Sequence, residues 1–309
     1  MDFKENLFQN FVNEAGDLMT PSDKKVKKII HKIRKKVKKY VDNNNLSSLV
    51  IGISGGLDSA VVAALCQEKY TGVPLIGLSI PISNSRSHME MAKWVGEKYC
   101  SAFEEFNYWT EPDGFGAFNS VMSTVNAVDN IALKAGFNRE CFDYKVSQAN
   151  VKARLRMITL YDLARKTNGC VLSTDNYSEL WTGFFTLHGD HNDLGVIQFI
   201  EKYWEEIPIA KALGIREDII YQVPSDGLGV TERDTDEAQL GISYRELGPV
   251  IFAYENRFDK NLQNIFEEVK GIVRVRNVIR RHERMKFKMN WPHFITREDL
   301  KLKNKFTRS

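Results

Sequence analysis

Short runs of apolar residues alternate along the chain with longer stretches in which apolar positions recur every three or four residues. The short runs predict strands, and they are residues 49–53, 75–80, 103–108, 170–173 and 219–223. The longer stretches predict helices, and the clearest are residues 60–69, 87–99 and 121–166. Strands that alternate with helices form a parallel sheet covered on both faces. We therefore expect an α/β protein with a doubly wound parallel sheet flanked by helices.

Helical segments are also expected at both ends of the chain. Residues 24–41, KKVKKIIHKIRKKVKKYV, place one apolar stripe on an otherwise basic helix. Such a helix could bind nucleic acid or an anionic membrane surface. Alternatively, its apolar stripe packs against the rest of the protein and its lysines remain in water, which is the interpretation that we favour. An amphipathic segment at 265–279 predicts a helical C-terminal extension. We expect a single domain over residues 1–309, with helical segments at 1–45 and 246–309.

Composition narrows the protein class. The 309 residues are 27% charged and 43% apolar, with a net charge of +3, which is typical of a soluble globular protein. No apolar run approaches the roughly 20 residues that span a bilayer, and the first residues lack the order of a signal peptide, so we expect a cytoplasmic protein without a membrane partner. The four cysteines form no C-x-x-C pair, which favours free thiols over a disulfide framework or a zinc site.

The turn after the first predicted strand carries the clearest chemistry. Residues 53–65 read ISGGLDSAVVAAL, that is, the end of a strand, a glycine turn and a helix. Such a turn directs backbone N–H groups and a helix N-terminus at one point, which suits phosphate. Ser54 and Ser59 add hydroxyl donors, and the Asp58 carboxylate requires a cation such as Mg²⁺ between itself and phosphate. The alternative is a turn whose aspartate merely caps the helix.

Three later segments extend this pattern. They are NVKARLRM at 150–157, STDNYSELWTGFFT at 173–186 and a turn-rich loop at 223–244. The Ser-Gly-Gly-x-Asp-Ser string resembles the pyrophosphate-binding loop of the ATP pyrophosphatases. With these segments added, the chain resembles the ammonia-dependent NAD synthetase family over roughly residues 45–285. The resemblance implies an adenine nucleotide alpha hydrolase-like fold and two small-molecule substrates besides ATP, deamido-NAD and ammonia.

The resemblance also implies a reaction. The nicotinate carboxylate of deamido-NAD attacks the α-phosphate of Mg-ATP, pyrophosphate leaves, and ammonia then displaces AMP from the acyl adenylate. Adenylation is needed because a carboxylate has no good leaving group, and most of the catalysis lies in positioning anions and neutralising their charge.

The family's functional positions carry over residue by residue. Those implied to bind ATP are Gly52, Ile53, Ser54, Gly55, Gly56, Leu57, Asp58, Ser59, Thr174, Lys202 and Ser225. Asp58 and Glu179 match the Mg²⁺ ligands, so Asp58, Glu179 and Lys202 form the implied catalytic set. Arg154, Asp193 and His282 match positions that bind the dinucleotide substrate, the last of them often across a homodimer interface.

The substrate half departs from the family pattern. Leu187 and Glu283 stand where lysines are usual, and Ser79 stands where many relatives have an ATP-contacting arginine. The string HGDHND at 188–193 also permits a zinc interpretation, although the family uses this segment for its acidic substrate. Loss of two lysines weakens the binding of a pyrophosphate group unless other cations replace them.

Alternatives to NAD synthesis follow from these departures. The same adenylation and amidation chemistry could act on another acid, such as a sugar uronate or a natural-product carboxylate. An RNA-modifying or RNA-binding protein would use the basic helices, but paired cysteines and an RNA module are missing, so we expect no nucleic-acid partner. A catalytically dead binding protein is disfavoured by Asp58, Glu179 and Lys202 together. No glutaminase domain is visible, so nitrogen comes from free ammonia or from a separate glutaminase.

Overall fold

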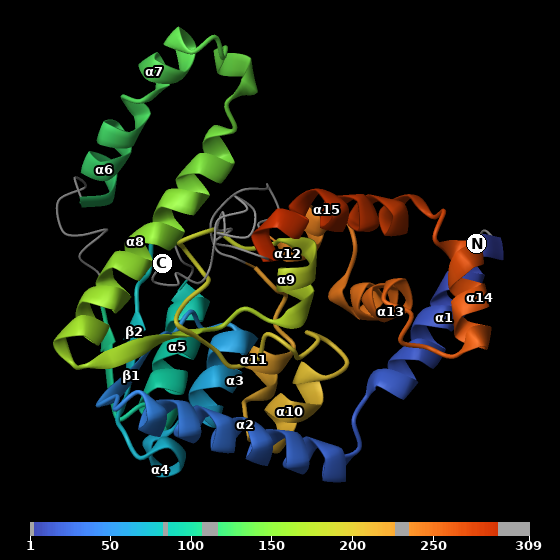
Figure 1. Ribbon diagram of the computed structural model, residues 1–309, viewed down its shortest axis with the longest axis horizontal. Coiled ribbons are helices and arrows are strands. Elements are labelled where there is room, and N and C mark those ends of the chain that lie inside the picture. Colours follow the sequence, from blue (N-terminus) through green and yellow to red (C-terminus); the bar gives the residue numbers. More distant parts are fainter. Residues whose placement is uncertain (1–2, 83–85, 107–116, 226–234, 290–309) are drawn as a thin grey trace, which may run out of the picture.

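The computed structural model describes residues 3–82, 86–106, 117–225 and 235–289 (Figure 1). Its strands are β1 (Ser48–Gly52), β2 (Leu75–Ser79), β3 (Ala102–Glu105), β4 (Gly169–Ser173) and β5 (Leu194–Gly195). They form a parallel sheet in the order β3-β2-β1-β4-β5, which confirms the expected fold class. The chain passes from β1 outward to β2 and β3 and then returns to β4 on the other side of β1. The strand order therefore reverses between β1 and β4, which is where ligands bind in sheets of this kind.

Helices cover both faces of the sheet. On one face lie α6 (Ala117–Asn126) and α8 (Tyr144–Lys166), and on the other α3 (Leu57–Leu65) and α5 (Arg86–Tyr99). A further layer outside α3 contains α2 (Asp23–Asn43), α4 (Glu68–Thr71), α10 (Glu206–Ala212) and α11 (Glu217–Ile220). The apolar stripe of α2 is buried in this layer, so its basic side chains lie outward. Within the described residues, no helix is both long and apolar enough to cross a membrane.

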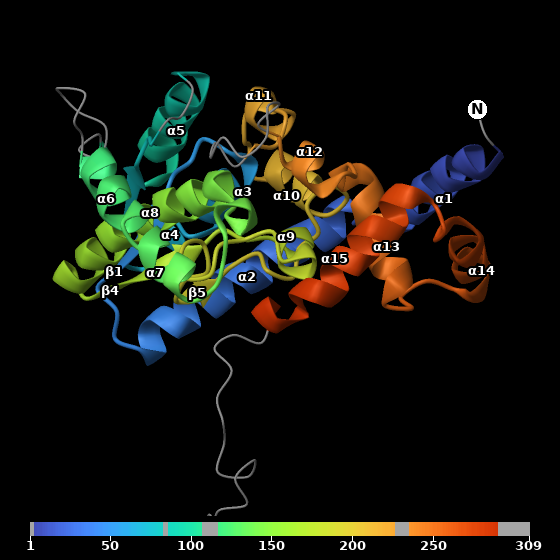
Figure 2. The ribbon, with the colours of Figure 1, turned by 90° about the horizontal axis from the view of Figure 1, so that it is seen from above.

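A second core beside the sheet joins the first helix to the last helices of the described chain (Figure 2). It is built by α1 (Phe3–Met19), α9 (Tyr177–Thr182), α12 (Asp236–Leu240), α13 (Tyr244–Tyr254), α14 (Lys260–Val269) and α15 (Val273–Met289). Trp181 of α9 is 1% exposed in this core, so the core fixes the helix that carries Glu179. The amphipathic segment 265–279 packs its isoleucines against the same core.

Several predicted elements differ from the observed ones. The strand predicted at 219–223 is wrong, because Ile219 and Ile220 are buried in α11, and a short apolar run fits a buried helical turn as well as a strand. The predicted helix 60–69 is split into α3 and α4. The predicted helical region 121–166 is divided into three helices: the end of α6, a short helix α7 (Asp129–Lys134), and α8. A 3₁₀ turn (Arg139–Cys141) lies between α7 and α8, and Asp143 caps α8. Two predicted segments extend beyond the described residues: the strand predicted at 103–108, after residue 106, and the C-terminal extension, after residue 289.

Candidate active site

The glycine turn between β1 and α3 has a conformation that only glycine adopts easily. Gly55 has a φ of +84°, and a Cβ there would lie 2.2 Å from the backbone oxygen of His88. The turn is closed by short polar contacts: the Gly56 N–H donates to Ser54 Oγ at 3.1 Å, and Ser59 Oγ donates to the Gly56 carbonyl at 3.0 Å. The turn thus holds its two serines beside the N-terminus of α3.

A cavity of about 630 Å³ opens at this turn, at the carboxyl ends of β1 and β4. Seven residues that were predicted to bind ATP line it from the end of β1, the turn and the start of α3, namely Gly52, Ile53, Ser54, Gly56, Leu57, Asp58 and Ser59. Four more residues predicted for the site reach it from other segments, namely Thr174, Glu179, Lys202 and Ser225. Gly55 shapes the turn without being part of the lining. The fold therefore brings the predicted ATP and metal residues together in one cavity.

Buried charge is concentrated at the base of this cavity. The Lys202 ammonium, 6% exposed, forms an ion pair with Asp58 and lies 3.8 Å from a carboxylate oxygen of Glu179. Asn176 donates from Nδ2 to the other Asp58 oxygen at 2.8 Å, and it also caps α9 in a reciprocal capping box with Glu179. The cap thus fixes both predicted metal-binding carboxylates relative to each other.

The carboxylates here outnumber the cation that neutralises them. Burial, and then the charge of Asp58, hold the pKa of Glu179 and that of Glu206 well above the usual range. Glu206 is fully buried at the start of α10, and neither of its oxygens accepts a hydrogen bond from the described residues. An excess of buried negative charge beside an anion-binding turn suits a bound cation.

The segment at 188–193 forms a polar network that reaches the same cavity through Asp175, Asp190 and Asn192. Asp175, 4% exposed, accepts a hydrogen bond from Ser173 at 2.8 Å and lies 3.1 Å from Nδ1 of His191, and this contact raises the pKa of His191. Burial raises the pKa of Asp190 to about 6. No group of three or more His, Cys, Asp or Glu side chains that could hold a metal occurs in the part of the chain that the structure describes, so the zinc interpretation gains no support.

The predicted substrate residues lie outside the lining of the cavity. Arg154 is exposed and donates to the Leu187 carbonyl at 3.3 Å. Asp193 accepts from the Val171 N–H at 2.9 Å. His282 is 6% exposed and its ring lies 3.9 Å from that of Trp181, nearly parallel to it. In this structure these groups serve packing and hydrogen bonding within the fold.

Three other cations line the cavity. Arg281 and Lys288 come from α15, and Arg156 comes from α8. Arg281 donates to the Thr182 carbonyl at 3.0 Å, and Lys288 to the Gly183 carbonyl at 2.9 Å, so each is anchored by the main chain. Burial lowers the pKa of both groups. The basic composition of 274–288 was visible in the sequence, but which of its cations face the cavity depends on how α15 packs.

Comparisons with known proteins place the chain in a family. The family model described as NAD synthase matches residues 29–292. An NH₃-dependent NAD(+) synthetase from Finegoldia magna is 33% identical over 236 residues, which is 76% of this chain and 88% of the relative. An NH₃-dependent NAD(+) synthetase from Methanocaldococcus jannaschii is 34% identical over 74% of this chain and 82% of its own.

Solved structures show the same fold. An NMN synthetase from Francisella tularensis matches with a TM-score of 0.68 at 24% identity, over 88% of this chain and 98% of its own. An NH₃-dependent NAD synthetase from Campylobacter jejuni matches with a TM-score of 0.63 at 24% identity, over 88% of this chain and 99% of its own.

Proposed function

Because the chain belongs to the NAD synthase family, we propose that it joins ammonia to the carboxylate of deamido-NAD at the expense of ATP, releasing NAD, AMP and pyrophosphate. It is therefore a ligase that forms a carbon–nitrogen bond. The observation that supports this most strongly is the single cavity in which the glycine turn, the Asp58, Glu179 and Lys202 cluster and the cations of α15 meet.

The turn and Lys202 form the ATP half of the site. Ser54, Ser59 and the N-terminus of α3 present donors to phosphate oxygens, and Lys202 is held where it can neutralise phosphate charge. Thr174 and Ser225 line the same cavity and complete the proposed ATP contacts. Because these donors are already fixed by the fold, little reorganisation is required as pyrophosphate leaves.

The residues present fit the Mg²⁺ ion that the family implies. Asp58 and Glu179 would hold it, since both are largely buried and the single Lys202 ammonium does not balance the local carboxylates. Two carboxylates suit an ion that also takes phosphate oxygens and water. When bound, Mg²⁺ would neutralise phosphate charge and polarise the phosphate under attack.

The adenylation and amidation steps balance with groups in the cavity. A carboxylate oxygen of the acid bonds to the α-phosphorus, and the bond from that phosphorus to pyrophosphate breaks. Ammonia then bonds to the carbonyl carbon, and the bond to AMP breaks. Ammonium must lose one proton before it attacks, and Asp190, which lines the cavity with a pKa of about 6, is suited to accept it. The nitrogen loses a second proton as the bond to AMP breaks, and the phosphate of the departing AMP or solvent takes it up.

The cations of α15 compensate for the lysines that the sequence lacks. Leu187 lies outside the cavity lining, whereas Arg281 and Lys288 line it. In the part of the chain that the structure describes, both donate to main-chain carbonyls and neither forms an ion pair with a carboxylate. We propose that they bind the pyrophosphate of deamido-NAD, because half-buried cations with no carboxylate partner favour an anionic ligand.

The decisive experiment measures pyrophosphate release with ATP, ammonium and a panel of acids. Deamido-NAD is expected to support the highest kcat/KM. The panel includes nicotinate mononucleotide, because a structural neighbour is an NMN synthetase, and a sugar uronate as the acid of another class. Release with another acid but none with saturating deamido-NAD would overturn the proposed substrate. Glutamine in place of ammonium, with and without a separate glutaminase, identifies the nitrogen source.

We also propose a homodimer that works in the cytoplasm. The helix α7 buries none of its residues in the single chain, and it projects from the body with α6 and the adjoining end of α8 (Figure 1). Val128, Ile131 and Phe137 around it are 55%, 68% and 61% exposed, which suits a surface covered by a second copy. The free thiols Cys66, Cys100 and Cys170 suit a reducing compartment.

A further inference from the structure

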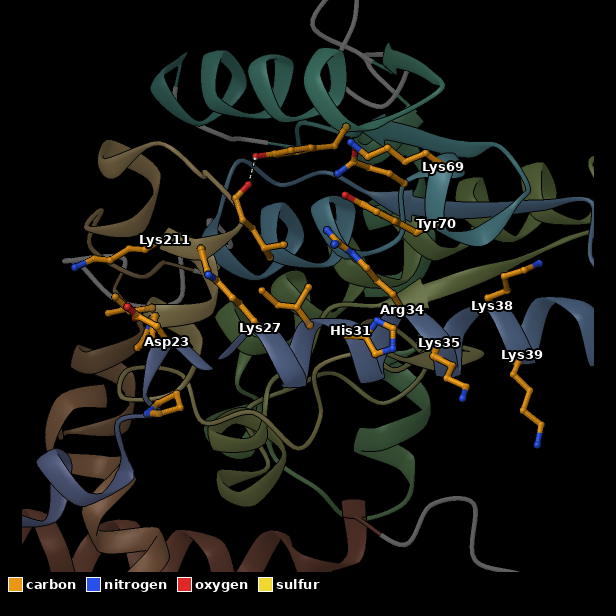
Figure 3. Close-up of a pocket in the computed structure, with 18 of the residues that line it drawn as sticks. Asp23, Lys27, His31, Arg34, Lys35, Lys38, Lys39, Lys69, Tyr70 and Lys211 are labelled. Carbon is orange, nitrogen blue, oxygen red and sulfur yellow. Dashed lines mark hydrogen bonds between the residues drawn. The ribbon is translucent and has the colours of Figure 1, made fainter. Parts of the chain in front are cut away.

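A second, larger concavity lies on the outer side of α2, and we call it the basic groove (Figure 3). Its volume is about 1510 Å³ and it shares no lining residue with the active-site cavity. Its basic lining residues are Lys27, His31, Arg34, Lys35, Lys38, Lys39, Lys69, Lys98 and Lys211. The acidic lining residues are Asp23 and Asp42. A pocket for one small molecule usually measures about 300–1,000 Å³, so this groove suits a more extended ligand.

The positive charge of the groove is largely uncompensated. Lys38 forms an ion pair with Asp42 at 3.0 Å. Within the described residues, Lys27, Lys69 and Lys211 take part in no ion pair with a carboxylate. Excess cations on the lining of a concave surface focus an electrostatic field that attracts anions.

These cations come from several elements that face one another. Lys27 and Arg34 project from α2 toward the opposite wall, where α4 supplies Lys69 and Tyr70 and α10 supplies Lys211 (Figure 3). A stack fixes Arg34, since its guanidinium carbon lies 3.4 Å from the centre of the Tyr70 ring. The two-walled arrangement differs from a helix whose lysines merely point into water.

The shape of the groove favours an extended polyanionic chain over a membrane surface as its ligand. Its apolar lining residues, such as Ile30 at 7% and Tyr99 at 6% exposure, are recessed and cannot insert into lipid. Along α2, Lys27 and Lys38 are eleven residues apart and thus separated by about 17 Å, which matches several repeats of a polyanionic backbone. Seven of the nine basic lining residues are lysines, whose ammonium groups bind phosphate as point charges.

We propose that the basic groove binds single-stranded nucleic acid through its backbone phosphates, without reading the sequence. This departs from the sequence-based expectation of no nucleic-acid partner, because a basic helix alone does not reveal that α4, α5 and α10 form a facing wall. Grooves of this kind typically take about 4–16 nucleotides and show strong salt dependence. The groove is separate from the active-site cavity, since the two share no lining residue.

The test compares two triple variants of equal charge change by fluorescence anisotropy, with a labelled oligo(dT) of about 12 nucleotides in about 50 mM salt. One variant is Lys27→Gln/Lys69→Gln/Lys211→Gln, which removes a cation from three elements of the groove. The matched control is Lys28→Gln/Lys32→Gln/Lys36→Gln, whose lysines are exposed on α2 outside the groove lining. Wild-type protein is expected to bind, and the groove variant to lose about tenfold in affinity while the control loses about twofold or less.

Salt and competitors make the outcome decisive. The slope of log affinity against log salt is expected to fall by about 2 in the groove variant, since each phosphate contact on a single strand contributes about 0.7. Absence of binding by wild-type protein, or equal losses in the two variants, would refute the proposal. Tighter binding of anionic phospholipid vesicles or of a polyglutamate peptide would assign the groove to a different partner. Pyrophosphate release by the groove variant is expected to equal wild type, which separates this result from the proposed function.

Discussion

Buried charge is concentrated around Lys202. One ammonium faces Asp58, Glu179 and Glu206, and the pKa values of the two glutamates are raised. Uncompensated buried carboxylates are costly, so this cluster is a place where binding of a cation and of ATP relieves an electrostatic strain of the fold. Loss of one carboxylate should therefore affect catalysis far more than stability.

Isosteric substitutions test this assignment. Asp58→Asn and Glu179→Gln should each lower pyrophosphate release by about 100-fold or more, because each removes a ligand of the ion that neutralises phosphate. Asp162→Asn serves as the control, since Asp162 is exposed on α8 and pairs with Lys166. Urea unfolding should show that all three variants remain folded. Near-normal turnover by either active-site variant would contradict the metal assignment.

Lys288 offers a test of the substrate half. Lys288→Gln should raise the KM for deamido-NAD about tenfold and leave kcat nearly unchanged, because a charged hydrogen bond to the substrate is lost in both ground and transition states. Lys286→Gln is the matched control on the same helix, where Lys286 is exposed and pairs with Glu283. Equal KM values for the two variants would show that Lys288 only anchors α15.

Glu201 links stability to pH. It is fully buried, and burial raises its pKa from 4.5 to about 7. Between these values the folded protein keeps a proton that the unfolded chain has released, so stability falls as pH rises through this window. The shift corresponds to about 3 kcal/mol. Other buried carboxyl groups, Asp190 among them, lower stability in the same direction, so urea unfolding from pH about 4.5 to 8 should show a loss in both proteins that is smaller in Glu201→Gln. Parallel profiles would contradict the prediction.

The turn between β1 and α3 depends on one backbone conformation. Gly55→Ala should lower stability by about 1–3 kcal/mol, because alanine resists the positive φ and its Cβ would lie 2.2 Å from the His88 carbonyl oxygen. The distorted turn should also bind ATP more weakly. Gly214→Ala controls for the backbone effect, since Gly214 has a φ of +73° but nothing within 4 Å of a Cβ. Equal effects of the two substitutions would show that the contact with His88 is unimportant.

The sequence was informative where a pattern is local. The strands β1, β2 and β4 and the helices α2 and α5 follow from apolar periodicity to within a few residues. By contrast, β5 has two residues, Leu194–Gly195, and is defined by its pairing with β4, which no local pattern encodes. The same limit applies to the site: Asp58 lies within a motif, whereas Glu206 and Lys288 reach it only through the packing of α10 and α15.

Assembly is the property of the whole molecule that the structure makes testable. A six-residue helix that buries nothing is marginal in water, and the proposed dimer would cover α7. Light scattering of wild type should give twice the chain mass of 35.5 kDa. Ile131→Glu should shift the protein toward the monomer, whereas Asn130→Glu, an exposed polar position on the same helix, should not. A fully active wild-type monomer at assay concentration would refute the dimer.

Helix α10 lies between the two concavities of the molecule. Its first residue, Glu206, belongs to the charge cluster of the active site, while Ile207, Pro208 and Lys211 line the basic groove. A ligand in the groove that displaces this helix changes the free energy of binding ATP, and thermodynamic linkage makes the effect reciprocal. Nucleotide in the active site would then alter the affinity of the groove for its ligand by the same factor. The two binding affinities would be coupled through a helix of about two turns.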